Sequence, residues 1–455
     1  MLKTFPKGGV HPPENKLSAD RPIETAPITA MVTIPLSQHI GAPSVVRVKV
    51  GDRVKAGQLI AESAGFVSAN IHSSVSGTVK KVDSFLDASG YKRPAVQIAV
   101  EGDEWEEGID TTDILKTEIV DSAEEIIKKV SAAGIVGLGG ATFPSHVKLS
   151  VPQGKKAEMV MINGVECEPY LTCDHRLMLE KGPEIIVGIR ILMKALNVSK
   201  AIVGIENNKP DAIANLQECA SRGVSHTPPK DVSHTPPKDV LHTPQQEIKI
   251  YPLEVKYPQG GEKQLIKAAT GREVPSGKIP VDVGVVPFNV ATVFAVYEAV
   301  QKNKPLVERL VTVTGKGLSK PSNFRVRIGA SINSLIQAAG GMPETAGKII
   351  NGGPMMGKAM ATADIPVTKG CSGILLIDES EAKRPPAREC IRCAKCVEVC
   401  PMGLEPYLIM PLAENQLFNR AKEKHVNDCI ECGSCSYTCP SARPLLDYIR
   451  LAKKK

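Results

Sequence analysis

The chain has 455 residues, of which 42% are hydrophobic and 23% charged, a composition typical of a globular protein with about three domains. Its formal net charge of +7 is modest, and no mixed basic and aromatic run indicates a nucleic-acid partner. The N-terminus has no apolar core of a secretory signal, and no run of about 18 apolar residues predicts a membrane-spanning helix.

Residues 1–30 are expected to form an N-terminal segment, and residues 31–105 an all-β domain. Between residues 40 and 100, short β-branched runs alternate with Gly-centred turns, which predicts strands. The strings VKVGDRVKAGQLIAE and SSVSGTV resemble the two halves of the biotinyl/lipoyl-like barrel-sandwich family. The hairpin tip that carries a modified lysine in that family reads VSANIHS here, so we expect a barrel-sandwich domain without a swinging arm.

Residues 115–305 alternate predicted helices and strands, the pattern of an α/β domain. Ser122 and Glu125 form a capping box that starts a helix, and Gly134 suits its end. The apolar runs AEMVMING and KAIVGIEN predict buried strands, and the stretch PEIIVGIRILMKAL between them predicts a helix.

Within this domain, residues 224–244 repeat the unit SHTPPKDV. Because paired prolines exclude helices and sheet interiors, the insertion is expected to be exposed and extended. His226, His234 and His242 recur in it, which leaves a metal-binding tract as an alternative to plain repetition in a tolerant loop.

Residues 306–378 predict a strand, a turn, a second strand and a helix capped by Ser331. This pattern resembles the SLBB family, which has a β-grasp fold. The charged, proline-containing segment DESEAKRPPARE then predicts a linker into the last domain, residues 379–455.

Eight of the 12 cysteines lie in that last domain, in the runs CIRCAKCVEVCP and CIECGSCSYTCP. The spacing C-x2-C-x2-C-x3-C-P is that of bacterial ferredoxins, in which the fourth cysteine of each run binds the other cluster. We therefore predict two [4Fe–4S] clusters, one held by Cys390, Cys393, Cys396 and Cys439 and the other by Cys429, Cys432, Cys435 and Cys400. Structural zinc, the alternative, is usually built from pairs of C-x2-C, which these triplets fit poorly.

A Gly-rich loop follows the first predicted helix of the α/β domain. Gly137, Gly139 and Gly140 would let the backbone approach a phosphate, and Lys148 could add a cation, although a plain turn is the alternative. The loop does not follow the dinucleotide fingerprint G-x-G-x-x-G, because Thr142 stands at its last glycine.

The loop GLGGATFPSHVK is similar to the flavin loop of the NADH-oxidising flavoprotein subunit of respiratory complex I. The segments INGVECEP, GGEKQLI and VPFNVATVFAVYEA resemble further segments of that family in the same order. The order of all the domains resembles the RnfC family, whose members are subunits of Rnf electron-transport complexes, over nearly the whole chain apart from the repeat.

The resemblance implies a set of cofactor-binding residues. The FMN phosphate would be cradled by Gly137, Gly139, Gly140 and Lys148, and the flavin would be hydrogen-bonded by Asn163 and Asn289. The nicotinamide would be bordered by Glu168 and Glu262, and Glu166 forms an acidic pair with Glu168. Phe143 would stack on the adenine. Two positions depart from the complex I family, since Val165 and Lys263 stand where it has carboxylates.

Electron counting also favours a flavin. NADH gives up two electrons as a hydride, whereas an iron–sulfur cluster accepts one, so a carrier that handles both is needed between them. The expected fold is multidomain α/β: an all-β barrel-sandwich hybrid, an α/β FMN/NAD domain, a β-grasp SLBB domain and an α-helical two-cluster ferredoxin module.

The resemblance implies an NAD-linked oxidoreductase subunit of an ion-translocating ferredoxin:NAD oxidoreductase, peripheral to the cytoplasmic face of the bacterial membrane. Its partners would be the other subunits of a membrane Rnf-type complex, with ferredoxin reached through one of them and Na+ or H+ transport in them. Two alternatives are a scaffold or docking subunit that carries clusters without its own NADH chemistry, and a dehydrogenase for a small-molecule acceptor.

Overall fold

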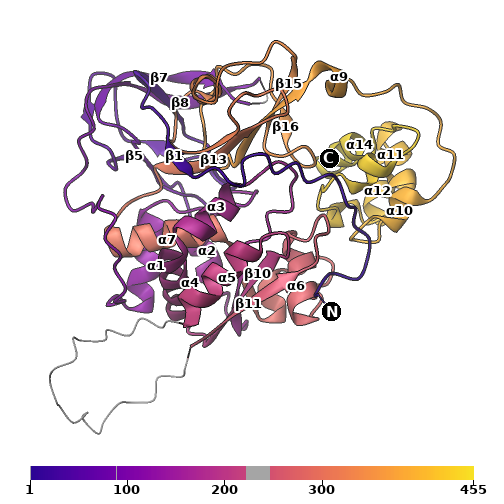
Figure 1. Cartoon of the computed structure of the whole chain (residues 1–455), viewed down its shortest axis with the longest axis horizontal. Coiled ribbons are helices and arrows are strands. Elements are labelled where there is room, and N and C mark those ends of the chain that lie inside the picture. Colours follow the sequence, from indigo (N-terminus) through magenta and orange to yellow (C-terminus); the bar gives the residue numbers. More distant parts are fainter. Residues whose placement is uncertain (1, 89, 222–245) are drawn as a thin grey trace, which may run out of the picture.

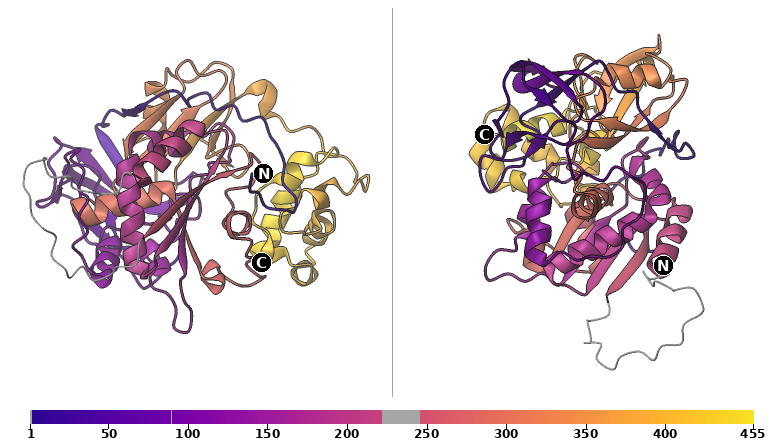
Figure 2. Two further views of the ribbon diagram at one scale, coloured as in Figure 1. Left: turned by 60° about the horizontal axis from the view of Figure 1, so that its bottom comes forward. Right: turned by 90° about the vertical axis from the view of Figure 1, so that its left-hand side faces the viewer.

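The computed structural model describes residues 2–88, 90–221 and 246–455 (Figure 1). The repeat insertion predicted at residues 224–244, with His226, His234 and His242, lies outside the described residues. Figures 1 and 2 both place the C-terminal helical module at one end of the molecule, away from the N-terminal β-sandwich. None of the helices that the structure describes has the length and apolar character that a bilayer crossing requires.

The first domain packs two antiparallel sheets, of strand orders β2-β8-β7-β4 and β3-β5-β6. The alternating side chains of Val32 and Ile34 point into a core shared with Ile60 and Ile98. The strands are β2 (Met31–Pro35), β3 (Val45–Val46), β4 (Arg53–Val54), β5 (Leu59–Glu62), β6 (Ile71–His72), β7 (Gly77–Leu86) and β8 (Lys92–Val100).

The α/β domain is built on a four-stranded parallel sheet of order β11-β10-β9-β12. Its strands are β9 (Met159–Asn163), β10 (Lys200–Glu206), β11 (Glu247–Leu253) and β12 (Val285–Asn289). Its helices are α1 (Ala123–Ala132), α2 (Ser145–Leu149), α3 (Cys173–Glu180), α4 (Gly182–Leu196), α5 (Pro210–Ser221), α6 (Glu262–Thr270), the 3-10 turn η1 (Pro280–Val283) and α7 (Val290–Lys302). The capping box of Ser122 and Glu125 starts α1.

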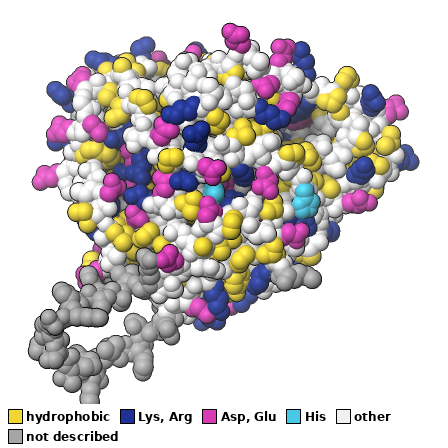
Figure 3. All heavy atoms as spheres, in the orientation of Figure 1, with side chains coloured by type: hydrophobic (Ala, Val, Ile, Leu, Met, Phe, Trp, Pro, Cys, Tyr) yellow, Lys and Arg dark blue, Asp and Glu magenta, His cyan; other side chains and the backbone are white. Residues whose placement is uncertain are grey.

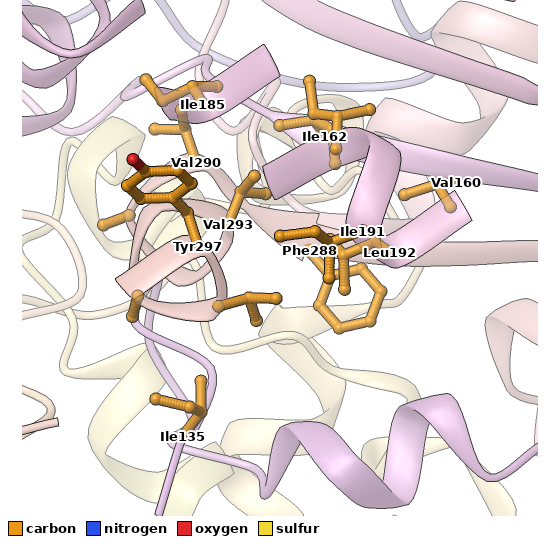
Figure 4. Close-up of a cluster of buried hydrophobic side chains, with 14 of the residues drawn as sticks. Ile135, Val160, Ile162, Ile185, Ile191, Leu192, Phe288, Val290, Val293 and Tyr297 are labelled. Carbon is orange, nitrogen blue, oxygen red and sulfur yellow. The ribbon is translucent and has the colours of Figure 1, made fainter. Parts of the chain in front are cut away.

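Helices cover both faces of this sheet because alternate residues of β9 are buried on opposite sides. Val160 and Ile162 belong to the core beneath α4 and α7, where Figure 4 shows them with Leu192 of α4. Met161 instead packs with Leu265 of α6 on the other face. Residues 159–162 of the run AEMVMING are therefore all apolar, as expected for a strand buried on both faces.

The third domain is a mixed sheet of order β1-β14-β13-β17-β15-β16. Its elements are β13 (Glu308–Thr314), β14 (Ser322–Arg327), α8 (Ile332–Ala338), β15 (Ala346–Asn351), β16 (Lys358–Ala359), β17 (Gly373–Asp378) and the short helix α9 (Glu379–Ala382). Ser331 caps α8 through the N–H of Asn333. The edge strand β1 (Ile23–Thr25) comes from the N-terminal segment and pairs with β14 in parallel.

The cluster module is helical, and a small apolar core that includes Ile409, Val426 and Ile449 holds it together. Its elements are α10 (Lys395–Glu398), α11 (Pro406–Glu414), α12 (Phe418–Glu423), η2 (Val426–Asp428), α13 (Ser434–Thr438) and α14 (Leu445–Lys453). Acidic and basic side chains are mixed over the molecular face that Figure 3 shows, in keeping with the modest net charge.

The N-terminal segment is a strap that touches three of the domains. The Gly9 N–H donates to the carbonyl of Val399 in the cluster module at 2.9 Å, and Val10 forms an antiparallel bridge with Tyr257 of the α/β domain. The strap then ends in β1 of the third domain. It thus connects the α/β domain, the cluster module and the SLBB-like sheet.

Candidate functional site

Two of the predicted flavin-binding residues meet at the carboxyl edge of the parallel sheet. Asn163 is the last residue of β9 and Asn289 the last of β12, and the two are direct partners in the strand register. The chain continues from β9 toward β10 on one side and returns to β12 on the other, so the strand order reverses between β9 and β12. Ligands of open α/β sheets bind at such a reversal, and we call this region the switch-point site.

Both asparagine side chains are fixed by hydrogen bonds. The amide of Asn163 donates to the carbonyl of Gly260 at 2.8 Å, and its oxygen accepts from Val165 N–H at 3.1 Å. The oxygen of Asn289 accepts from Ala291 N–H at 2.9 Å, which caps α7. These contacts hold both amides in one orientation at the ends of their strands.

The Gly-rich loop lies against Asn289. A side chain on Gly139 would place its Cβ only 2.9 Å from the Asn289 Cβ, a distance that real contacts do not reach. Gly139 and Gly140 are exposed, and the positive φ of Gly140 (+151°) favours glycine. The Gly137 N–H donates to the carbonyl of the half-buried Phe143 at 2.8 Å, closing the loop. Glycine at residue 139 therefore lets the backbone of the loop lie close to Asn289.

Lys148 and Glu262 come from distant segments and form an ion pair of 2.5 Å. Lys148 also donates to the carbonyl of Pro287 in β12 at 3.1 Å. Glu262 is the first residue of α6. The structure therefore brings both predicted residues to the same edge of the sheet, but it pairs them with each other.

The acidic pair has two different partners. The Glu166 carboxylate accepts from the N–H groups of Asp174 (2.7 Å) and His175 (3.2 Å), so it caps the first turn of α3. The Glu168 carboxylate accepts from the N–H groups of Met355 (3.1 Å) and Met356 (2.7 Å) in the third domain. Glu168 therefore links the loop after β9 to the SLBB-like domain.

Burial raises the pKa of Glu168 to about 7, although the amide donors of Met355 and Met356 oppose the shift. A carboxyl whose folded pKa lies above its unfolded value stabilises the fold at low pH, and that contribution is lost as the pH rises toward 7. Glu168→Gln, which stays neutral, should therefore lose less stability than the wild type between pH 5 and pH 8. Thermal unfolding of both proteins over this pH range measures the free energy of unfolding, and we expect the wild type to lose about 3 kcal/mol more than Glu168→Gln. Parallel curves of unfolding free energy against pH would contradict this expectation.

Asp174 was not singled out by any sequence motif, yet it lies in the switch-point site. Its carboxylate accepts from the Asn289 amide at 2.7 Å, and burial followed by the nearby Glu166 raises the pKa of Asp174 to about 7. Asp174 is an acidic residue in the first turn of α3, which is common in helices and does not by itself mark a site. Asp174 therefore helps to orient the Asn289 amide.

The strap supplies a second residue that sequence reasoning missed. The buried ammonium of Lys16 donates to the carbonyls of Glu166 (2.8 Å), Glu168 (2.9 Å) and Leu171 (2.7 Å). In this loop Glu166 and Tyr170 adopt positive φ angles of +48° and +70°, which are unfavourable for side chains other than glycine. Lys16 therefore holds a strained loop that carries both members of the acidic pair.

Lys16→Met should lower kcat/KM for NADH-dependent flavin reduction by at least about tenfold, because the loop loses its three buried donor contacts. Lys3→Met is the matched control, since Lys3 lies on the same strap and donates to the carbonyl of Ala269, away from the loop. Stopped-flow bleaching of the flavin measures both variants. Equal losses in the two would show that Lys16 acts only by fastening the strap.

The two cysteine runs fold in the same way. Left-handed residues occur at matching positions, Arg392 and Ala394 in the first run and Glu431 and Gly433 in the second. Each run thus winds into a tight loop followed by a short helix, α10 or α13. Such winding turns the thiols of one run toward a common point, as a four-iron cluster requires.

The thiols fall into groups that cross between the runs. Burial, with Cys439 and Cys390 among the nearby charges, raises the pKa of Cys396. Burial, with Cys429, Cys432 and Cys400 nearby, raises the pKa of Cys435 more strongly. The described cysteines form no disulfide, and of the other four, Cys173 and Cys371 are buried and Cys167 and Cys219 half-buried. Thiolates grouped in this way are the donors that a [4Fe–4S] cluster needs, so the residues present fit the predicted clusters.

The fold and the site together define an electron-transfer protein of the iron–sulfur flavoprotein class. Residues 130–298 match the Nuo51 FMN-binding domain, residues 3–104 the RnfC barrel sandwich hybrid domain, residues 310–359 the SLBB domain and residues 378–440 the 4Fe-4S dicluster domain. These matches confirm the predicted fold class and the predicted FMN and iron–sulfur cofactors.

Three relatives share most of their length with this chain. It is 46% identical to the C subunit of the proton-translocating ferredoxin:NAD(+) oxidoreductase complex of Clostridium ljungdahlii, over 100% of this chain and 94% of the relative. The C subunit of the Na(+)-translocating complex of Acetobacterium woodii is 43% identical over 99% and 96%. The C subunit of the ion-translocating oxidoreductase complex of Rhodobacter capsulatus is 42% identical over 88% and 73%. The chain therefore belongs to the RnfC family, whose members are subunits of ion-translocating ferredoxin:NAD(+) oxidoreductase complexes.

A chain of an NAD+-reducing [NiFe]-hydrogenase in the H2-reduced state has a similar structure. The TM-score is 0.53 at 18% sequence identity, over 74% of this chain and 63% of that chain. This similarity shows a shared fold.

Proposed function

We propose that this chain is the NAD(H)-linked electron-transfer subunit of an ion-translocating ferredoxin:NAD oxidoreductase complex. The observation that carries the proposal is the meeting of Asn163, Asn289 and the Gly139 loop at the reversal point of a parallel sheet, in a chain that also holds two ferredoxin-type cysteine runs. FMN, when bound there, supplies the exchange between a two-electron hydride and single electrons.

The residues of the switch-point site have separate tasks in this proposal. The backbone of Gly137, Gly139 and Gly140 leaves room for a phosphate, while Asn163 and Asn289 present fixed amides to the flavin. Phe143, Lys148, Glu166, Glu168 and Glu262 border the nucleotide region. Because Lys148 is paired with Glu262, we propose that this pair acts together, the cation toward phosphate and the acid toward NAD(H).

The cluster of the second run lies next to the flavin domain. The buried Tyr257 donates its O–H to the carbonyl of Cys432 at 2.7 Å. Tyr257 and Cys432 pack together with Cys167, which lies between the two acids of the loop after β9. We infer that electrons pass between the flavin and the Cys400, Cys429, Cys432 and Cys435 cluster, and from there to the cluster of Cys390, Cys393, Cys396 and Cys439.

The relatives are subunits of ion-translocating complexes, so we place this chain among partner subunits in such a complex. In this proposal it lies on the cytoplasmic face of the membrane, the partners carry the ion path, and ferredoxin is reached through one of them. We retain the boundaries 1–30, 31–105, 115–305, 306–378 and 379–455 as the proposed domains.

The test is anaerobic reduction of the cofactor-loaded chain by NADH. The proposal expects rapid bleaching of the flavin absorbance and NADH-dependent reduction of ferricyanide. A flavin that NADH does not bleach would favour the alternative in which the chain is a cluster-carrying scaffold.

A further inference from the structure

The two cysteine runs are equivalent in sequence but differ in their exposure. Cys390 and Cys393 of the first run are exposed, whereas their counterparts Cys429 and Cys432 are half-buried and buried. The second run is covered by two parts of the chain. Tyr257 donates its O–H to the Cys432 carbonyl, and the carbonyl oxygen of Met355 lies 2.8 Å from the position of a Cβ on Gly433.

The strap contacts the first run near its end, where the Gly9 N–H donates to the carbonyl of Val399, but the part of that run that holds Cys390 and Cys393 is exposed. Every residue from Lys383 to Lys395 is exposed, and Figure 1 shows this segment as a wide loop between α9 and α10 at the outer edge of the cluster module. Because electron tunnelling weakens steeply with distance, the exposed edge of Cys390 and Cys393 is where an electron can leave or enter the relay.

The exposed segment carries cations without acidic partners. Within the described residues, the side chains of Arg388, Arg392 and Lys395 form no ion pair, whereas Lys383 and Arg384 of the same segment pair with Glu379 and Asp447. Between the free cations stands Ile391, which is 68% exposed. Glu389 also lies in this segment, so its exposed charges are mainly rather than solely positive, and an apolar side chain among them fits an interface that is steered electrostatically.

We propose that Arg388, Ile391, Arg392 and Lys395, together the port surface, dock an acidic one-electron carrier domain of a partner subunit. The inference rests on the proposed function, since it assigns the exit of the same relay. In each encounter one electron moves: as the carrier is reduced by one electron, the cluster of the first run is oxidised by one, and the roles reverse for the opposite flow. Ile391 anchors the contact, and the three cations attract the acidic face.

The alternative occupant is an anionic membrane surface, which basic segments also bind. A membrane, however, offers no acceptor to the exposed cysteines, and Ile391 alone is a small apolar anchor. The exposed thiols therefore favour a redox protein over lipid.

The experiment uses the full cofactor-loaded chain and a purified acidic bacterial ferredoxin as the carrier probe, with the dissociation constant measured by calorimetry at low salt. The triple variant Arg388→Glu, Arg392→Glu and Lys395→Glu should weaken binding at least tenfold. Added salt should weaken binding of the wild type, since the interaction is between exposed charges. Arg420→Glu, Lys454→Glu and Lys455→Glu, which change three other exposed residues by the same charge, should leave binding within about twofold of the wild type.

Unchanged ferredoxin binding in the port-surface variant would overturn the proposal. The proposal would also be overturned if the port-surface variant lost co-sedimentation with phosphatidylglycerol vesicles but still bound ferredoxin, because the surface would then be a membrane contact. Iron content and flavin bleaching by NADH should be unchanged in both variants. If NADH fails to bleach the flavin of the wild type while ferredoxin binding still depends on the port surface, the proposed function fails and the docking surface stands.

Discussion

Gly139→Val should abolish flavin retention while leaving about eight iron atoms per chain, the content of two four-iron clusters. The glycine is required because a Cβ at this position would meet the Asn289 Cβ at 2.9 Å, so the larger valine must displace either the loop or the amide. Acid release of the flavin, measured by fluorescence, and iron analysis of the same sample give both numbers.

Gly65→Val is the matched control for this variant. A Cβ at Gly65 meets no atom within 4 Å, and its φ is not positive, so both cofactors should be retained. Parallel loss of flavin and iron in Gly139→Val would indicate misfolding, and full retention of flavin would show that the Gly-rich loop does not cradle the phosphate.

Cys396→Ala should remove one of two cluster signals from the EPR spectrum and lower the iron content to about four atoms per chain. Cys396 lies near Cys390 and Cys439, whereas Cys435 lies near Cys400, Cys429 and Cys432, so the cluster of the latter group should persist. NADH should still bleach the flavin, because the remaining cluster lies on the flavin side of the relay.

The control for the cluster variant is Cys371→Ala. Cys371 is fully buried in the third domain, outside both cysteine runs, and burial raises the pKa of its thiol to about 11. Its removal should leave the iron content and the EPR spectrum intact. An unchanged spectrum in Cys396→Ala would contradict the crossed ligand assignment.

Local signals in the sequence predicted much of the fold. The capping box of Ser122 and Glu125 lies where it was expected, because cap hydrogen bonds are made within one turn of chain. The strand in the run AEMVMING was recognisable because burial on both faces makes residues 159–162 all apolar. Asn289, in the segment VPFNVATVFAVYEA, caps α7.

The contacts that organise the site could not be predicted from local patterns. Lys16 reaches carbonyls about 150 positions away, and no periodicity reports such a contact. Glu166 and Glu168 were treated as one acidic pair, but the loop between them turns their carboxylates to a helix start and to another domain. Asp174 was missed because an acidic first turn is ordinary, and only the fold brings it to Asn289.

The proposed function requires one chain to hold both a two-electron and a one-electron carrier. The most direct test is cofactor analysis of the anaerobically purified protein, with flavin, iron and acid-labile sulfide measured together. The account predicts one FMN with about eight iron and eight sulfide per chain. A colourless protein that contains zinc in place of iron and no flavin would contradict it.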